Sequence, residues 1–129
     1  MTYKGVVIEE SLENKSVLDD FKILSTKVEL ITPRHKTPWI KQWTLHTVEI
    51  PQDKAMSVAE RISKSLDSEH GHAWYADFKS ENDHYIIFRN KVFHVTDRRS
   101  KEQYDAVTQY GISLGIPDYQ LNFSPHIKQ

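Results

Sequence analysis

Three short runs of β-forming residues stand close together between residues 73 and 96, and they constrain the fold more than any other part of the chain. The runs cover residues 73–79, 84–89 and 92–96, with turn segments at 80–83 and 90–91. Each turn contains an asparagine, a residue that tolerates the positive φ required by tight hairpins. We therefore predict three antiparallel strands joined by two hairpin turns.

The turn positions also predict which side chains share a face of this sheet. If Lys79 pairs with His84 and Arg89 pairs with Val92, opposed residues lie on the same face. One face then collects Trp74, Ala76, Phe78, Tyr85, Ile87, Val92 and His94, and the other collects Tyr75, Asp77, Ile86, Phe88, Phe93 and Val95. Both faces are largely apolar, whereas a sheet with one helical layer has a polar outer face. We expect the second face to be covered by residues 3–31 or by a second copy of the chain, with an open ligand-binding face as a third possibility.

The rest of the chain supplies two helices and further strands. An apolar stripe at helical spacing predicts a helix over residues 53–67, and Ser100 followed by Gln103 predicts the capped start of a second helix over 100–114. Strands are predicted at residues 3–10, 21–31, 43–50 and 118–123. From residue 43 onward the order is close to the split βαβ pattern of ferredoxin-like folds. We expect one α+β domain over residues 1–129, a two-layer sandwich that is ferredoxin-like or related, with a mostly antiparallel sheet, two helices on one face and an N-terminal β-hairpin extension.

Composition excludes several classes of protein. The chain has no cysteine, which excludes disulfides, thiol nucleophiles and sulfur-ligated metal sites. Its net charge of -1 lacks the basic footprint of a duplex-binding protein, which argues against nucleic acid as the partner. No apolar run approaches the roughly 18 residues of a membrane span, and charged residues precede any long apolar run near the start. We expect a cytoplasmic protein with no signal peptide, no membrane partner and no cofactor.

Histidines and carboxylates suggest two candidate chemical sites. Glu69, His70 and His72 have a spacing that can ligate a metal, but the register offers no third histidine nearby, so a turn with exposed histidines is the favoured interpretation. His46 lies in a predicted strand and could act as an acid or base with Asp77 or Glu49.

The loop from Arg34 to Trp43 combines basic and aromatic side chains. Its candidate contact residues are Arg34, His35, Lys36, Trp39, Lys41 and Trp43. Tryptophan and arginine are enriched where proteins bind partners, and charge with stacking suits anionic ligands or single-stranded nucleic acid. The alternative is a loop pinned to the core by a tryptophan and surrounded by solvated lysines.

Three segments, HKTPWIKQWTLHTVEIP, HAWYADF with HYIIFRNKVFHV, and YGISLGIPDYQLNF, resemble a small prokaryotic family of uncharacterised proteins. The resemblance covers most of the chain. It implies a compact, cytoplasmic, stand-alone domain and carries no activity, cofactor or catalytic residue that can be transferred.

Three hypotheses about function follow. The first is a small cytoplasmic binding or interaction domain that forms a homodimer through the second sheet face, with the Arg34–Trp43 loop as a contact surface for a protein partner or small anionic ligand. The second is an enzyme with a histidine and carboxylate site, with or without a metal. The third is binding of single-stranded nucleic acid or an anionic ligand through the Arg34–Trp43 loop.

Overall fold

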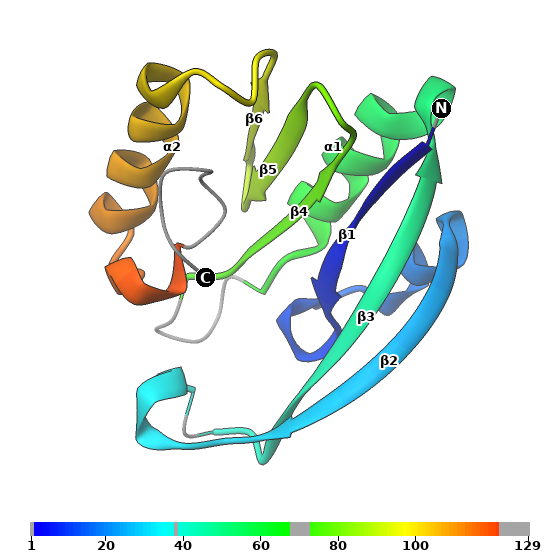
Figure 1. Cartoon of the computed structure of the whole chain (residues 1–129). Coiled ribbons are helices and arrows are strands. Elements are labelled where there is room, and N and C mark those ends of the chain that lie inside the picture. The colour runs from blue at the N-terminus through cyan, green and yellow to red at the C-terminus, as the bar shows by residue number, and fades with distance from the viewer. Residues whose placement is uncertain (1, 38, 68–72, 122–129) are drawn as a thin grey trace.

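An antiparallel sheet with the strand order β2-β3-β1-β4-β5-β6 runs through the computed structural model, which describes residues 2–37, 39–67 and 73–121 (Figure 1). The strands are β1 (Thr2–Ile8), β2 (Lys22–Leu30), β3 (Gln42–Pro51), β4 (Tyr75–Lys79), β5 (His84–Phe88) and β6 (Lys91–Val95). The two main helices are α1 (Ala55–Ser65) and α2 (Lys101–Ser113), and short 3-10 turns include η1 (Glu9–Ser11), η2 (Lys15–Asp20), η3 (Pro33–His35), η4 (Gln52–Lys54) and η5 (Asp118–Gln120). The α+β class and the antiparallel sheet are confirmed. None of the described helices is long and apolar enough to cross a membrane.

The β4–β5–β6 meander has the predicted faces with one change of register. Lys79 pairs with His84 and Phe78 with Tyr85, as the first turn predicts. At the second turn Phe88 pairs with Lys91, so the predicted pairing of Arg89 with Val92 is wrong. The turn is Arg89–Asn90, and Asn90 adopts a φ of 59°. Because the partner shifts by two residues, every side chain stays on its predicted face.

The helices cover opposite faces of this meander. Side chains of α1 pack in one apolar cluster with Trp74, Phe78 and Ile87, while Tyr104 and Val107 of α2 pack in another with Ile86 and other residues of the second face (Figure 1). The prediction that both helices share one face is therefore wrong. Over β5 and β6 the second face is covered by α2 of the same chain, because both faces of these strands are apolar and each needs its own cover.

The N-terminal strands do not form the predicted hairpin. Strand β1 lies in the centre of the sheet, paired with β3 on one side and β4 on the other, and β3 separates it from β2. The run Val6-Val7-Ile8 is apolar on both faces and suits a central strand, whereas β2 is exposed along almost its whole length. Residues 118–120 form a 3-10 turn where a strand is predicted, so the described residues do not complete the ferredoxin-like pattern.

Candidate functional site

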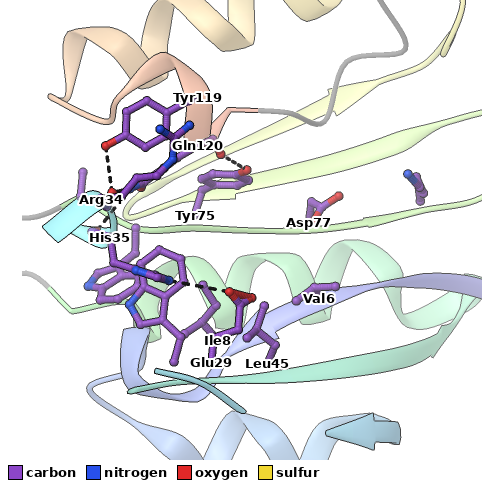
Figure 2. Close-up of a pocket in the computed structure, with 14 residues that line it drawn as sticks. Val6, Ile8, Glu29, Arg34, His35, Leu45, Tyr75, Asp77, Tyr119 and Gln120 are labelled. Carbon is purple, nitrogen blue, oxygen red and sulfur yellow. Dashed lines mark hydrogen bonds and ion pairs between the residues drawn. The ribbon is translucent and has the colours of Figure 1, made fainter. Parts of the chain in front are cut away.

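A pocket of about 540 Å³ opens on the second face of the sheet, where α2 does not reach (Figure 2). Its apolar floor comes from neighbouring strands: Val6 and Ile8 of β1 and Leu45 of β3. Tyr75 and Asp77 of β4 continue the floor toward α2. The remaining lining residues come from the ends of β2, β3 and β4 and from two 3-10 turns: Glu29, Arg34, His35, Trp43, Ala73, Trp74, Lys79, Tyr119 and Gln120.

A contact between η3 and η5, which we call the lip, closes one side of the pocket. The Tyr119 hydroxyl donates to the Arg34 carbonyl over 2.8 Å, and the Gln120 amide donates to the carbonyls of Arg34 and His35 over 3.1 and 3.2 Å. The Arg34 guanidinium also lies 3.9 Å from the centroid of the Tyr119 ring. The lip joins segments about 85 residues apart in the sequence, so the pocket forms only when the whole sheet is assembled.

Local backbone geometry aims the tip of the β2–β3 hairpin at η5. Thr32 and His35 form a capping box at the start of η3, and Lys36 ends that turn with a φ of 64°. The His35 ring lies 3.7 Å from the Glu29 carboxylate and packs edge-on against Trp43, with ring centroids 4.5 Å apart. These contacts hold both His35 and Glu29 on the pocket wall (Figure 2).

Asp77 is held in place at the pocket by a buried histidine. Its carboxylate lies 2.6 Å from Nε2 of His84, which is completely buried, and Nδ1 of His84 lies 2.9 Å from the Tyr104 hydroxyl. A carboxylate only accepts, so Nε2 of His84 carries the hydrogen of the contact with Asp77. Burial raises the pKa of Tyr104, which keeps its hydroxyl protonated as a donor. The arrangement presents an oriented carboxylate to the pocket.

The structure does not bring the predicted acid–base residues together. His46 lies on the first face, where its ring contacts Glu9 and Thr26 at 2.9 Å each. Asp77 and Glu49 lie on the second face, and Glu49 is not among the residues that line the pocket. Asp77 is the one member of this predicted set that lies at the pocket.

The Arg34–Trp43 loop divides between the pocket and the surface. Arg34, His35 and Trp43 line the pocket. Lys36, Trp39 and Lys41 do not line it and are exposed. Trp43 rather than Trp39 joins the loop to the core, and its indole nitrogen donates to the buried Thr37 hydroxyl over 2.9 Å.

The predicted metal ligands Glu69, His70 and His72 lie outside the described residues. Within residues 2–37, 39–67 and 73–121 no group of three or more histidines and carboxylates is arranged to hold a metal ion.

Sequence reasoning misses His84 as the partner of Asp77, although the signal is present. The predicted pairing of Lys79 with His84 places His84 on the face of Asp77 at a diagonal position, within reach of a long side chain. No sequence signal connects Tyr119 and Gln120 with Arg34. Comparisons with known proteins found no matching family model, no matching curated protein and no matching solved structure.

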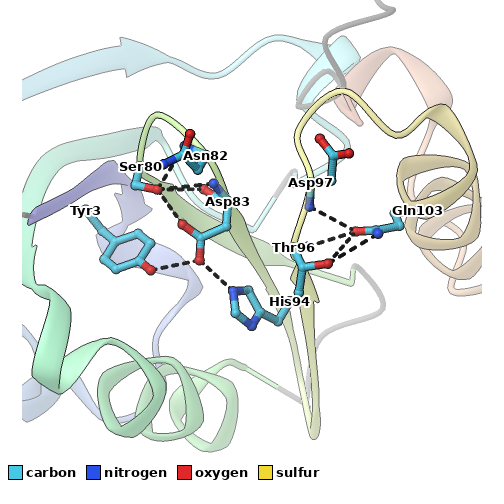
Figure 3. A network of polar contacts seen from close by, with 8 residues as sticks. All are labelled: Tyr3, Ser80, Asn82, Asp83, His94, Thr96, Asp97 and Gln103. Atoms are coloured by element: carbon cyan, nitrogen blue, oxygen red, sulfur yellow. Dashed lines mark hydrogen bonds and ion pairs between the residues drawn. The ribbon is translucent and has the colours of Figure 1, made fainter.

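A second polar cluster lies on the first face, around Asp83 (Figure 3). Its carboxylate accepts hydrogen bonds from the Tyr3 hydroxyl over 2.8 Å and from Nε2 of His94 over 2.6 Å, and it also accepts from the Ser80 hydroxyl. Burial alone would raise the pKa of Asp83, but these three hydrogen bonds outweigh burial and hold the pKa below its ordinary value. Burial raises the pKa of Tyr3 to about 12, and the Asp83 carboxylate adds to this shift. The cluster ties β1 to the β4–β5 turn.

Replacing Tyr3 with phenylalanine should remove a late step from the alkaline titration. Folding favours the neutral form of Tyr3. Its stabilisation of the folded protein is therefore complete below the ordinary pKa of 10.0 and is lost as the pH rises toward 12. At neutral pH Tyr3→Phe should lower the free energy of unfolding by about 1–2 kcal/mol, because a hydrogen bond to a carboxylate is lost. Tyrosinate absorbance follows the titration, with the exposed Tyr119→Phe as control. An unchanged late step in Tyr3→Phe would contradict this assignment.

Proposed function

We propose that the chain is a small cytoplasmic binding domain whose pocket takes a small organic anion with an apolar or aromatic body. The observation that carries the proposal is the pocket of about 540 Å³ closed by the lip. Small-molecule sites usually measure about 300–1,000 Å³ and combine apolar walls with a few polar groups. The lip uses backbone carbonyls of η3, which leaves the Arg34 side chain stacked on Tyr119 at the pocket edge.

The walls favour a ligand with an apolar body. The floor is formed by aliphatic side chains of β1 and β3, and the aromatic rings of Trp43, Tyr75 and Tyr119 surround it. A bound ring can pack on these faces and edges at the distances typical of aromatic pairs.

The available charges favour an anionic group on that ligand. Both pocket carboxylates have histidine partners: Glu29 lies near His35 and Asp77 is bonded to His84. The cations of Arg34 and Lys79 form no ion pair with any residue that the structure describes. A ligand carboxylate or sulfonate would find two positive partners in the pocket.

Binding of 1-anilinonaphthalene-8-sulfonate, an aromatic anion with a fluorescence that rises in apolar sites, tests the proposal. We expect one saturable site on the native protein. Lys79→Gln should weaken binding about tenfold, because a hydrogen bond to a charged group is lost. Leu45→Trp should abolish binding, because the larger ring points from the floor into the pocket.

Two controls separate this site from binding elsewhere. Lys64→Gln removes the same charge from α1, on the opposite face of the sheet, and should leave the affinity unchanged. A neutral analogue, N-phenyl-1-naphthylamine, should bind more weakly than the sulfonate. Equal binding by wild type, Lys79→Gln and Leu45→Trp would overturn the proposed site, provided that all variants unfold at similar denaturant concentrations.

A second candidate function is an enzyme that uses Asp77 as a general base. The observation that favours it is the oriented carboxylate, held by the buried His84 at the pocket wall. Positioned general bases contribute about 10²–10⁴-fold to rate. A panel of p-nitrophenyl carboxylate esters is a direct screen: turnover that falls at least about 100-fold in Asp77→Asn, while dye binding persists, would support an enzyme. Turnover that is absent, or unchanged in Asp77→Asn, would count against it.

A further inference from the structure

Strand β2 ends the sheet and presents a bare edge. Eight of its nine residues are exposed, and no described element pairs with its outer side (Figure 1). Large apolar side chains are unusually exposed here: Val28 at 51% and Leu30 at 77%. An edge strand offers unpaired N–H and C=O groups to any strand that can lie beside it.

Only half of β2 has the usual protection against such pairing. A register shift between Ile23 and Ser25 marks a bulge, and bulges disturb the hydrogen-bonding pattern of an edge. Ser25–Leu30 follows without a further shift and contains no proline. A regular six-residue edge therefore remains available.

We propose that two copies of the chain pair antiparallel through Thr26–Leu30 of this regular edge, with the two-fold axis at Val28. The pairing of β2 with β3 places Thr26, Val28 and Leu30 on one face, and Ser25, Lys27 and Glu29 on the other. In a sheet that continues across both copies, directly opposed residues share a face. The two-fold axis must therefore pass through a residue and not between two residues.

Charge selects the axis at Val28. An axis at Lys27 sets two lysines opposite each other, and an axis at Glu29 does the same with two carboxylates. An axis at Thr26 draws the bulged Leu24 into the pairing. The axis at Val28 sets each Lys27 opposite Glu29 of the second copy, which gives two opposite-charge pairs.

The apolar face of the same register is also complementary. Val28 meets Val28 of the second copy, and each Leu30 meets Thr26, which buries the two most exposed apolar side chains of the segment. One strand pair is small beside a standard interface, so we expect a weak dimer with a dissociation constant on the order of 10–100 µM. Because Glu29 lines the pocket, Lys27 of the second copy would lie near the pocket rim.

Single cysteines test the register directly, because the chain has no cysteine of its own. Val28→Cys places two thiols at the axis, and oxidation by copper phenanthroline should link them rapidly. Thr26→Cys and Leu30→Cys each place the two thiols about 13 Å apart, too far for a disulfide. Thr26→Cys alone and Leu30→Cys alone should each form the disulfide about tenfold more slowly than Val28→Cys. An equal mixture of these two variants should form the disulfide-linked mixed dimer. Equal rates for all three variants would overturn the register.

A charge exchange provides an independent test by sedimentation velocity from 10 µM to 1 mM. Lys27→Glu and Glu29→Lys should each weaken the dimer about tenfold or more, and the double variant should restore it. Lys22→Glu, on the far side of the bulge, is the matched control and should have little effect. A wild-type chain that stays monomeric at 1 mM would overturn self-pairing and leave the edge for a strand of another protein. Failure of the double variant to restore the dimer would also overturn it.

Discussion

Gly5→Ala is expected to destabilise the protein by about 3 kcal/mol or more, among the largest effects of any single methyl group in the chain. Gly5 lies in β1 opposite Phe78 of β4. A Cβ atom at this position would overlap the carbonyl oxygen of Asp77 and lie 2.6 Å from its carbonyl carbon. These are backbone atoms of the neighbouring strand, so no side-chain rotation can relieve the overlap.

Urea unfolding measures this cost, and Gly115→Ala is the matched control. A methyl group at Gly115 has nothing within 4 Å and meets only the strain of a φ of 90°. That strain costs about 1–2 kcal/mol. If Gly5→Ala is no more destabilising than Gly115→Ala, the close approach of β1 and β4 is wrong. The pocket floor would then be wrong too, since Val6 and Asp77 pair across these same strands.

His84→Leu is expected to cost about 3 kcal/mol although the side chains are similar in volume. The imidazole is completely buried and contacts both the Asp77 carboxylate and the Tyr104 hydroxyl. Its replacement removes one hydrogen-bond partner from each of these groups. Removing one partner of a buried hydrogen bond costs about 1–3 kcal/mol, so the two losses together cost about 2–6 kcal/mol. The Asp77 side chain retains some exposure, which places our value at the lower end of that range.

A double-mutant cycle isolates the Asp77–His84 contribution. Asp77→Leu with His84→Leu replaces both partners by apolar groups, and the double variant should be more stable than the sum of the single effects predicts by about 1–2 kcal/mol. His94→Leu is the control, because the His94 ring is one-third exposed, hydrogen-bonds to Asp83 and stacks on Tyr85, and has no described contact with Asp77 or His84. Additive single effects would show that His84 does not hold Asp77.

The predicted parts of the fold are those fixed by local pattern. The alternation around Phe78 and Tyr85 assigns each side chain of the β4–β5–β6 meander to the correct face, even though the partners across the second turn shift by two residues. The helix start at Ser100 is also confirmed, since its hydroxyl accepts from the backbone N–H of Gln103. These features depend on neighbours a few residues apart, and sequence spacing reports them directly.

The parts that sequence could not predict depend on long-range competition. The residue patterns of β1 and β2 do not distinguish a β1–β2 hairpin from a sheet in which β3 lies between them. Either arrangement satisfies the backbone hydrogen bonds of both strands. Which face of the sheet α2 covers is likewise decided by long-range contacts and not by the sequence of the helix. The lip is a contact of Tyr119 and Gln120 with backbone carbonyls of η3. Because every residue has a backbone carbonyl, neither composition nor periodicity predicts which one accepts a hydrogen bond.

Of the candidate site, the residue types were predictable and their grouping was not. Arg34, His35, Trp43 and Asp77 are all at the pocket, but the sequence assigned the first three to a loop surface and Asp77 to His46. The pocket arises because the β2–β3 hairpin reaches across the second face to η5. The contact joins segments about 85 residues apart in the sequence, so no local pattern reports it.

The most direct measurement is a filtered nuclear Overhauser experiment on methyl-labelled protein with bound 1-anilinonaphthalene-8-sulfonate. We predict contacts between the aromatic protons of the dye and the methyl groups of Val6, Ile8 and Leu45, which form the pocket floor. Val58 and Ile62 of α1, which are buried against the opposite face of the sheet, should show none. Dye contacts confined to the exposed methyl groups of β2, or no contact with the floor at saturation, would contradict a ligand site beneath the lip.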